Sequence, residues 1–444
     1  MTHWPKVDPL QGMSAASGHY LDSLGFFGWQ LGLERIHALC AAFGNPQNGL
    51  PCVHLAGTNG KGSTAAMLAA IGRAAGLRTG LYTSPHLVHV RERVQINGQP
   101  IRSKDFDRLL QESRSAIDKL RATYFEALTA LAFAYFAEQK VDWAVIETGL
   151  GGKLDATNVI TPEVTIITSI GLEHQRYLGK TLAEIAHEKA GIIKAGRPCV
   201  SGVKSKRAQD VIVAQGRKLG AMVLRAQACA RISAIKLAAT ASTFRLSSQE
   251  LGFDYSSLVL NLPGRHQLDN AALAVIAAHL LRARSINISE AAIRQGLAEV
   301  HWPGRMQVLR TFPPILIDAA HNPEGMRMLV RGIQELFPRR KPHVVMGLLQ
   351  DKSPVQVMRA WRNLRPQFFF VPVAADRTRP PSHLAEAAGR FGCRSELHAS
   401  ARAGFRAARQ RAGKRDLLVV TGSHYLLGEL MAEGLLPYPY LSQL

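Results

Sequence analysis

Apolar and polar residues alternate along this chain in a pattern that is typical of parallel sheets covered by helices. Short apolar runs that favour strands occupy residues 51–55, 78–82, 141–146 and 164–170, and later 315–317, 343–346, 368–373 and 417–420. Stretches with helical spacing of apolar residues separate them, among them 65–75, 123–138, 184–190 and 271–281. The alternation predicts an α/β fold in both parts of the chain.

Some segments depart from this alternation. Residues 230–262 contain β-rich runs, and residues 94–98 end in the Asn-Gly pair of a tight hairpin. Residues 1–20 lack periodicity and predict a loose lead-in, whereas apolar spacing predicts a helix from Leu31 to Leu39. Trp302-Pro-Gly-Arg305 interrupts the helical pattern, so we expect one domain over residues 1–300 and a second over residues 301–444.

The composition adds a strong basic balance. The 444 residues include 54 basic and 33 acidic side chains, a formal net charge of +21, which should attract anions such as nucleotides. The basic residues are spread out, however, and no tract of basic and aromatic residues predicts nucleic-acid binding. Five cysteines without a Cys-x-x-Cys pair, and no exported or membrane-spanning segment, predict a cytoplasmic protein.

One glycine-rich stretch joins the first strand to its helix, and it reads His54-Leu-Ala-Gly-Thr-Asn-Gly-Lys-Gly-Ser-Thr64. Glycines let backbone N–H groups converge on an anion, the helix start adds its positive dipole, and Lys61 supplies a mobile cation. The strict G-x-x-x-x-G-K-[ST] pattern fails, because Leu55 replaces its first glycine and Gly62 separates Lys61 from Ser63. We predict a phosphate-binding loop, with a ligand-free turn as the alternative.

Polar side chains follow several of the predicted strands. Glu147 ends the strand at 141–146, His174 follows the strand at 164–170, and Ser84 follows the strand at 78–82. Ligands gather at the carboxyl ends of parallel strands, where a carboxylate is well placed to hold Mg²⁺ on bound phosphates. Asp318 and His321 follow the first strand of the second domain in the same way. A surface turn is the alternative for Ser84, and a structural role is the alternative for His174.

Other residues have simple structural explanations on pattern alone. Glu188 and Lys189 are typical of a solvated helix face, and Phe125 of an apolar core. Asn270 and Asn322 are typical helix caps.

Five motifs in order resemble the folylpolyglutamate synthase/dihydrofolate synthase family of the Mur ligase superfamily, from about Leu31 to the C-terminus. They are Gly57-Thr-Asn-Gly-Lys-Gly-Ser63, Thr83-Ser-Pro-His-Leu87, Glu147-Thr-Gly-Leu-Gly-Gly-Lys-Leu-Asp-Ala-Thr-Asn158, His187-Glu-Lys-Ala-Gly-Ile-Ile-Lys194 and Asp318-Ala-Ala-His-Asn-Pro323. The resemblance implies a P-loop-containing parallel-sheet ATPase domain (1–300) followed by a smaller Rossmann-like α/β glutamate-ligase domain (301–444).

The activity implied by the resemblance is an ATP-dependent ligase that adds L-glutamate to dihydropteroate and to reduced folates, a step of folate biosynthesis and one-carbon metabolism. The γ-phosphate would pass to the substrate carboxylate, and the amino group of glutamate would attack the resulting acyl phosphate. Catalysis would then rest on positioning and charge neutralisation. The alternatives are a folate-extending enzyme only, a murein-type amino-acid ligase, or, in another class, a nucleic-acid-stimulated ATPase.

The resemblance also implies roles for single residues. Two Mg²⁺ ions would be held by Ser84, Glu147 and His174, and Lys189 would be a carbamylated metal ligand. Lys61, His174 and Lys189 would form the catalytic group. The nucleotide would touch Gly57, Thr58, Asn59, Gly60, Lys61, Gly62, Ser63, Thr64, Asn270, Arg305, Asp318 and His321. The pterin-bearing substrate would lie near Phe125, Asp155 and Ala156, and the family also implies a monomer.

Three positions depart from the family pattern. Glu173 precedes His174 where Asp is typical, and Lys153 stands where Arg is usual, so both keep their charge. His424 stands where an aliphatic residue is expected, and the packing near the last strand is therefore not predicted.

Overall fold

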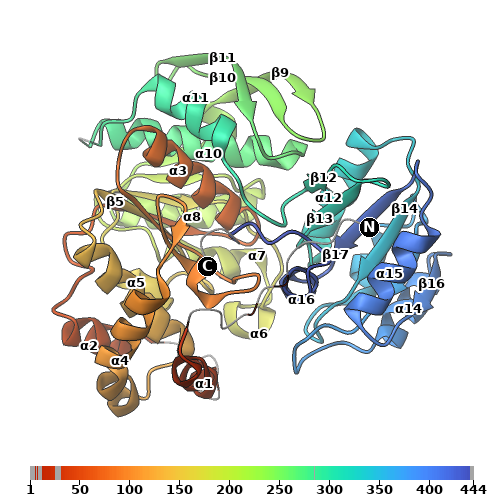
Figure 1. The fold of residues 1–444 in the computed structure, drawn as a ribbon. Coiled ribbons are helices and arrows are strands. Elements are labelled where there is room, and N and C mark those ends of the chain that lie inside the picture. The colour runs from red at the N-terminus through yellow and green to blue at the C-terminus, as the bar shows by residue number, and fades with distance from the viewer. Residues whose placement is uncertain (1–5, 7, 9–12, 26–31, 285, 441–444) are drawn as a thin grey trace.

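The computed structural model describes residues 6, 8, 13–25, 32–284 and 286–440. Two α/β lobes lie side by side, with a small sheet at the edge of the N-terminal lobe (Figure 1). The N-terminal lobe holds an eight-stranded and a three-stranded sheet, and the C-terminal lobe holds a six-stranded sheet. The α/β architecture is the one that the alternation of strands and helices predicts.

The large sheet of the N-terminal lobe has the strand order β4-β3-β2-β5-β1-β6-β7-β8. Its strands are β1 (Cys52–Ala56), β2 (Thr79–Tyr82), β3 (Val94–Ile96), β4 (Gln99–Pro100), β5 (Trp143–Glu147), β6 (Val164–Ile167), β7 (Cys199–Ser201) and β8 (Val223–Arg225). The six neighbouring strands β2-β5-β1-β6-β7-β8 are parallel to one another. The hairpin of β3 and β4 adds an antiparallel edge beside β2. Asn97 and Gly98 turn this hairpin with φ of 50° and 80°, as its Asn-Gly pair predicts.

Helices cover both faces of this sheet. One face carries α3 (Lys61–Ala74), α10 (Arg265–Arg282) and α11 (Glu290–Glu299). The opposite face carries α1 (Ala15–Leu24), α2 (Glu34–Ala42), α4 (Ser103–Leu120) and α5 (Tyr124–Glu138). Successive side chains of a strand point to opposite faces of the sheet, and in β5 both are apolar. Val145 packs in the core that contains α3 and Ile146 in the core that contains α5, so both faces need a cover of helices. The remaining helices of this lobe are α6 (Gln175–Leu178), α7 (Leu182–Ala190), α8 (Lys206–Lys218) and α9 (Ala226–Cys229).

The structure corrects the predicted boundaries in several places. Residues 1–20 are not all a loose lead-in, because α1 begins at Ala15. The helix predicted from Leu31 begins at Glu34, and Leu31 itself lies outside the described residues. The strand predicted over 164–170 ends at Ile167, because the hydroxyls of Thr168 and Ser169 donate to the Asn59 carbonyl of the phosphate loop at 2.7 and 3.0 Å.

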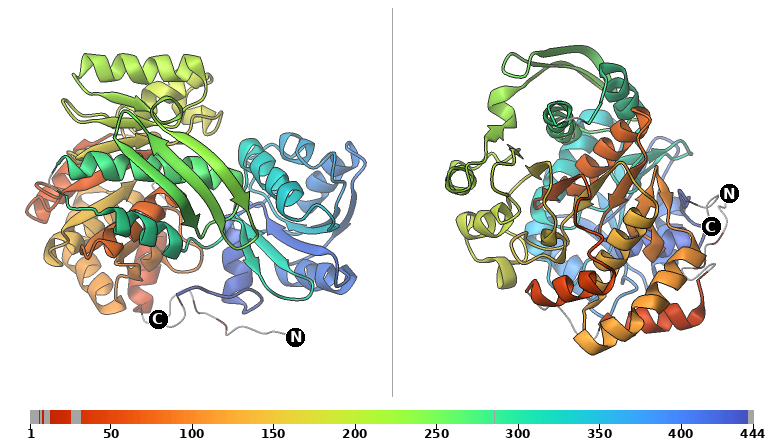
Figure 2. Two further views of the ribbon diagram at one scale, coloured as in Figure 1. Left: turned by 90° about the horizontal axis from the view of Figure 1, so that it is seen from above. Right: turned by 90° about the vertical axis from the view of Figure 1, so that its left-hand side faces the viewer.

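The β-rich segment 230–262 forms the antiparallel sheet of β9 (Arg231–Leu237), β10 (Ser242–Ser248) and β11 (Phe253–Leu260). Phe244, Leu246 and Leu258 pack with α10 and α11, so the inner face of this sheet extends the α3 core. Figure 2 shows it reaching from the N-terminal lobe toward the C-terminal lobe.

The C-terminal lobe is a mostly parallel sheet in the order β12-β13-β17-β14-β15-β16, with only β12 antiparallel to its neighbour. Its strands are β12 (Gln307–Leu309), β13 (Ile315–Asp318), β14 (Pro342–Met346), β15 (Gln367–Phe370), β16 (Arg394–Leu397) and β17 (Leu417–Thr421). The helices α12 (Pro323–Leu336), α13 (Pro354–Arg359) and α14 (Pro381–Gly389) cover one face, and α15 (Ala401–Arg411) and α16 (His424–Ala432) cover the other.

The two lobes are also joined by the loop that follows β2. Tyr438, near the C-terminus, donates its hydroxyl to the buried carboxylate of Glu92 at 3.0 Å, and Gln95 donates to the Tyr440 hydroxyl at 3.2 Å. The Leu87 carbonyl lies directly against Gly428 of α16. The loop that carries Ser84 is therefore packed against the C-terminal lobe. No helix in the part of the chain that the structure describes is long and apolar enough to cross a bilayer.

We predict that Gly428→Ala separates α16 from this loop. An added Cβ would lie 1.9 Å from the Leu87 carbonyl oxygen, and such overpacking against backbone costs about 1–3 kcal/mol. The midpoint of thermal unfolding should fall. Gly389→Ala is the matched control, because Gly389 is also helical but, apart from its own turn of helix, no atom of the described residues lies within 4 Å of an added Cβ. Equal midpoints for the two variants would contradict the packing argument.

Candidate active site

The loop between β1 and α3 has the geometry of an anion site. Gly57 and Gly60 have φ of 155° and 90°, and a Cβ at Gly60 would lie 2.4 Å from Asn270 Oδ1. α3 begins at Lys61, and among the described residues no side chain hydrogen-bonds to its N-cap position. The backbone N–H groups of its first turn are therefore left for a ligand, which the positive end of the helix dipole favours as an anion.

Lys61 and Glu147 face each other beside this loop. Lys61 Nζ donates to the Gly57 carbonyl at 3.1 Å and lies 3.8 Å from Glu147 Oε1, while the Ser84 backbone N–H donates to Glu147 Oε2 at 3.3 Å. Burial raises the pKa of Glu147, and the charge of Lys61 and the Ser84 bond offset part of that rise. The structure thus brings together Ser84 and Glu147, two of the three predicted metal ligands.

His174 and Lys189 both line a small cavity of about 30 Å³ beside the phosphate loop, and Lys61 and Glu173 line it too. His174 has a left-handed backbone, with φ of 51°. Burial lowers its pKa to about 4, although the charge of Glu173 opposes this, so its imidazole is neutral and able to ligate a metal.

The local pattern predicted that Lys189 lies on a solvated helix face, and the structure shows that this prediction is wrong. Its side chain is buried and donates to the Gly57 carbonyl at 2.8 Å. Burial, assisted by the nearby charge of Lys61, lowers the pKa of Lys189 to about 7. The hydrogen-bond partner of its ammonium group belongs to the phosphate loop, 132 positions away, and local periodicity does not report such a contact.

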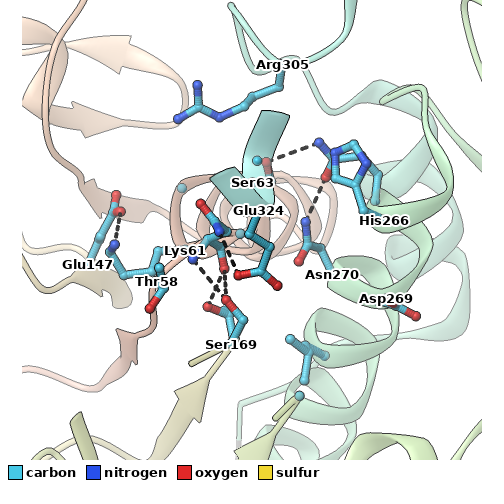
Figure 3. Close-up of a pocket in the computed structure, with 18 of the residues that line it drawn as sticks. Thr58, Lys61, Ser63, Glu147, Ser169, His266, Asp269, Asn270, Arg305 and Glu324 are labelled. Carbon is cyan, nitrogen blue, oxygen red and sulfur yellow. Dashed lines mark hydrogen bonds and ion pairs between the residues drawn. The ribbon is translucent and has the colours of Figure 1, made fainter. Parts of the chain in front are cut away.

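Asn270 is not a helix cap either, because α10 begins at Arg265 and Asn270 lies in its second turn. Its Nδ2 donates to Gln267 Oε1 at 2.9 Å, and Gln267 Nε2 lies 3.4 Å from Ser63 Oγ of the loop helix. Figure 3 shows Glu147 on one side of the start of α3 and Asn270 on the other, with Arg305 above it. The end of β5, the helix α10 and the segment before β12 thus surround the loop.

The C-terminal lobe supplies Arg305, Asp318 and His321. Arg305 donates to the Gly304 carbonyl at 3.1 Å and to His424 Nε2 at 3.0 Å. Asp318 accepts from the backbone N–H groups of Met306 and Ala320, each at 2.8 Å, and so holds the turn that carries Arg305. All three line the same cavity as the phosphate loop, a space of about 1840 Å³ between the lobes.

Glu173 fastens the two lobes together across this cavity. Its carboxylate accepts from Lys352 Nζ at 2.8 Å and from Asn322 Nδ2 at 3.2 Å, and lies 3.3 Å from His321 Nε2. Burial alone would raise the pKa of Glu173, but His321 and Lys352 outweigh it and hold the pKa well below its usual range. Asn322 does cap α12, and it also donates to Asn59 of the loop at 2.9 Å.

The lining of the cavity also includes the predicted substrate residues Phe125, Asp155 and Ala156, a group that we call its second arm. Phe125 lies over Gly149, where an added Cβ would come within 2.5 Å of its ring. The Asp155 carboxylate accepts from the Leu150 N–H at 2.7 Å and from the Thr157 N–H at 3.0 Å. Asp155 therefore shapes the turn after β5, and its contact with a substrate stays a prediction.

Sequence reasoning missed further residues of this arm. Arg93 donates to His86 Nδ1 at 3.0 Å, and its guanidinium lies 5.4 Å from the centre of the Tyr124 ring. Leu21 and Leu24 of α1 line the same arm. The two leucines are three residues apart, a helical spacing that the surrounding Gly and Ser residues obscured.

Two family models match this chain: the Mur ligase middle domain over residues 55–278 and the Mur ligase glutamate ligase domain over residues 304–424. The dihydrofolate synthase/folylpolyglutamate synthase of Bacillus subtilis (strain 168) is 38% identical over 75% of this chain and 78% of that protein. The chain belongs to the folylpolyglutamate synthase/dihydrofolate synthase family. As a family member it is an ATP-dependent ligase of folate metabolism, as its motifs predicted.

Solved structures of the family share this fold. The E. coli family member in complex with DHPP and ADP aligns with a TM-score of 0.83 at 30% identity, over 94% of this chain and 96% of that one. A bifunctional folylpolyglutamate synthase/dihydrofolate synthase with Mn, AMPPNP and L-glutamate bound aligns with a TM-score of 0.83 at 31% identity, over 95% and 98%. The predicted order of an ATPase domain followed by a C-terminal α/β domain is confirmed.

We predict that Glu173→Gln loosens the two lobes in the nucleotide-free protein. The substitution removes the charge that pairs with Lys352, whose side chain is 11% exposed, and removing one partner of a buried pair costs about 3–5 kcal/mol. Small-angle X-ray scattering should give a larger radius of gyration.

Glu335→Gln is the control for Glu173→Gln. Glu335 also bridges the lobes, through Arg265, but that arginine side chain is 44% exposed, and exposed pairs contribute only about 0–1 kcal/mol. Scattering from Glu173→Gln that matches the wild type would refute the fastening role.

Proposed function

We propose that this enzyme adds L-glutamate both to dihydropteroate and to reduced folates through an acyl-phosphate intermediate. The observation that carries the proposal is one cavity whose lining includes two unlike groups of residues, which we call its two arms. One arm holds the phosphate loop, Lys61 and Arg305, and the other presents aromatic rings and the cation of Arg93. An anionic nucleotide and an aromatic acid could therefore lie end to end within it.

The residues suggest how the reaction would proceed. A substrate carboxylate oxygen attacks the γ-phosphorus and ADP leaves; the glutamate amino nitrogen, after losing a proton, then attacks the acyl carbon and phosphate leaves. The loop N–H groups and Lys61 would neutralise the phosphate charge from one lobe and Arg305 from the other. No side chain needs to form a covalent bond, so positioning between the lobes is the main contribution of the protein.

The donor set fits a divalent cation on the nucleotide. In the described part of the chain no group of three or more His, Cys, Asp and Glu side chains could hold a metal ion by itself. Mg²⁺ does not need one, because it keeps several waters and binds through one or two carboxylates together with substrate phosphates. Glu147, Ser84 and neutral His174 would supply the protein ligands for two ions, which would stabilise charge on the transferred phosphoryl group. Relatives with Mn and AMPPNP bound support this reading.

A carbamate on Lys189 would complete the second metal site. Carbon dioxide adds to a neutral amine, and a pKa of about 7 leaves about half of Lys189 neutral at pH 7. The side chain already points into the small cavity shared with His174, so a carbamate there would place an anion beside that imidazole.

The first experiment measures ADP release by the purified enzyme with Mg²⁺ and L-glutamate, using dihydropteroate or tetrahydrofolate as the acceptor. We expect turnover with both acceptors, because the aromatic arm would hold the pterin and benzoate groups that the two share. Turnover with tetrahydrofolate alone would restrict the enzyme to extending folates. Turnover with neither would reject these acceptors.

The carbamate is tested by NMR with ¹³C-bicarbonate. We expect a carbamate carbonyl resonance that grows as the pH rises from about 6 to 8, because deprotonation of Lys189 through its pKa of about 7 supplies the reactive amine. Lys189→Arg should abolish the resonance. Lys194 is a second lysine, partly buried, that donates to the Asn158 carbonyl at 3.0 Å, and Lys194→Arg should retain the resonance. A resonance that survives in Lys189→Arg would assign the carbamate elsewhere.

A further inference from the structure

His424, one of the three departures from the family pattern, contacts the nucleotide-facing arginine of the C-terminal lobe. It is the first residue of α16, and its Nε2 lies 3.0 Å from Arg305 Nη2. The Ser423 side chain accepts from the Tyr425 N–H at 3.1 Å and fixes the start of the helix. The imidazole thus comes from a rigid element and not from a loop.

The hydrogen bond defines the state of the imidazole. A guanidinium has only donors, so Nε2 of His424 must be the acceptor and the ring proton must sit on Nδ1. Burial, followed by the charges of Arg305, His321 and Lys61, holds the pKa of His424 well below its usual range. His424 is therefore a neutral acceptor.

The described hydrogen-bond acceptors of Arg305 are neutral, so its positive charge is not offset and can attract an anion. Its other hydrogen bond goes to the Gly304 carbonyl, and among the described residues no carboxylate lies within ion-pair distance of its guanidinium. The carboxylates whose charge acts on Arg305 are already engaged: Asp318 accepts from two backbone N–H groups, and Glu147 faces Lys61. A carboxylate at position 424 would offset the arginine charge, and an aliphatic residue would leave Nη2 without this acceptor.

We propose that His424 is a positioning residue that directs the Arg305 guanidinium toward the nucleotide phosphates. This role rests on one part of the proposed function, namely that Arg305 contacts the nucleotide. His424 acts through Arg305, and its contribution disappears when the arginine is removed.

The test measures the affinity of AMPPNP with Mg²⁺ by isothermal titration calorimetry, which needs no folate acceptor. His424→Leu removes the acceptor while keeping similar bulk, and we expect about tenfold weaker binding, in the range of a hydrogen bond to a charged group. His424→Gln places an amide oxygen near the position of Nε2 and should recover most of the affinity. In steady-state assays His424→Leu should raise KM for ATP and leave KM for glutamate near the wild-type value.

Two further variants separate positioning from general packing. In an Arg305→Met background, His424→Leu should cause no additional loss of AMPPNP affinity, because the group it orients is gone. His383→Leu, at an exposed histidine of α14 in the same lobe, should bind as the wild type does.

Three outcomes would overturn the proposal: wild-type affinity in His424→Leu, equal losses in the Leu and Gln variants, or an undiminished effect in the Arg305→Met background. The proposed acceptors can fail independently. If neither folate acceptor is turned over but the Leu and Gln variants still differ in AMPPNP affinity, the role of His424 stands and the substrate assignment falls.

Discussion

The uncapped start of α3 is the constraint on which the rest of the site depends. Free backbone N–H groups converge at Gly60, and Lys61 and Lys189 both donate to the same carbonyl, that of Gly57. The positive charges add up in a buried space, and burial itself disfavours charge. This explains why the pKa values of Lys189 and His174 are lowered. The carboxyl group of Glu147 lies in the same buried space, 3.8 Å from the ammonium group of Lys61.

The division into two lobes makes this arrangement usable. Each lobe contributes one side of the cavity. The proposed acyl phosphate would need protection from water, which a site between two lobes can provide. Glu173 connects the segment before His174 to the C-terminal lobe, and the loop that carries Ser84 packs against α16. Movement of one lobe would therefore act directly on the residues around the phosphate loop, and closure of the lobes would be coupled to assembly of the proposed site.

The predictability of each element followed from the range of the interactions behind it. The strands β1, β5 and β17 are buried on both faces, so their continuous apolar runs located them to within one or two residues. The phosphate loop was recognisable because its glycines and lysine are consecutive. The helix α1 was missed, because its packing against α4 and α5 compensates for weak local preference.

The sequence by itself determined the family and the α/β order, and it supplied the candidate residues for phosphate and metal binding, because these depend on local periodicity and on contiguous motifs. Tertiary structure decided the environment of single side chains. Lys189 looked solvated but lies beneath the loop, Glu173 looked like a simple replacement but ties the lobes, and His424 looked out of place but holds Arg305. Each of these roles depends on partners more than 100 positions away, which only the folded chain brings together: within one lobe for Lys189 and for His424, and between the lobes for Glu173.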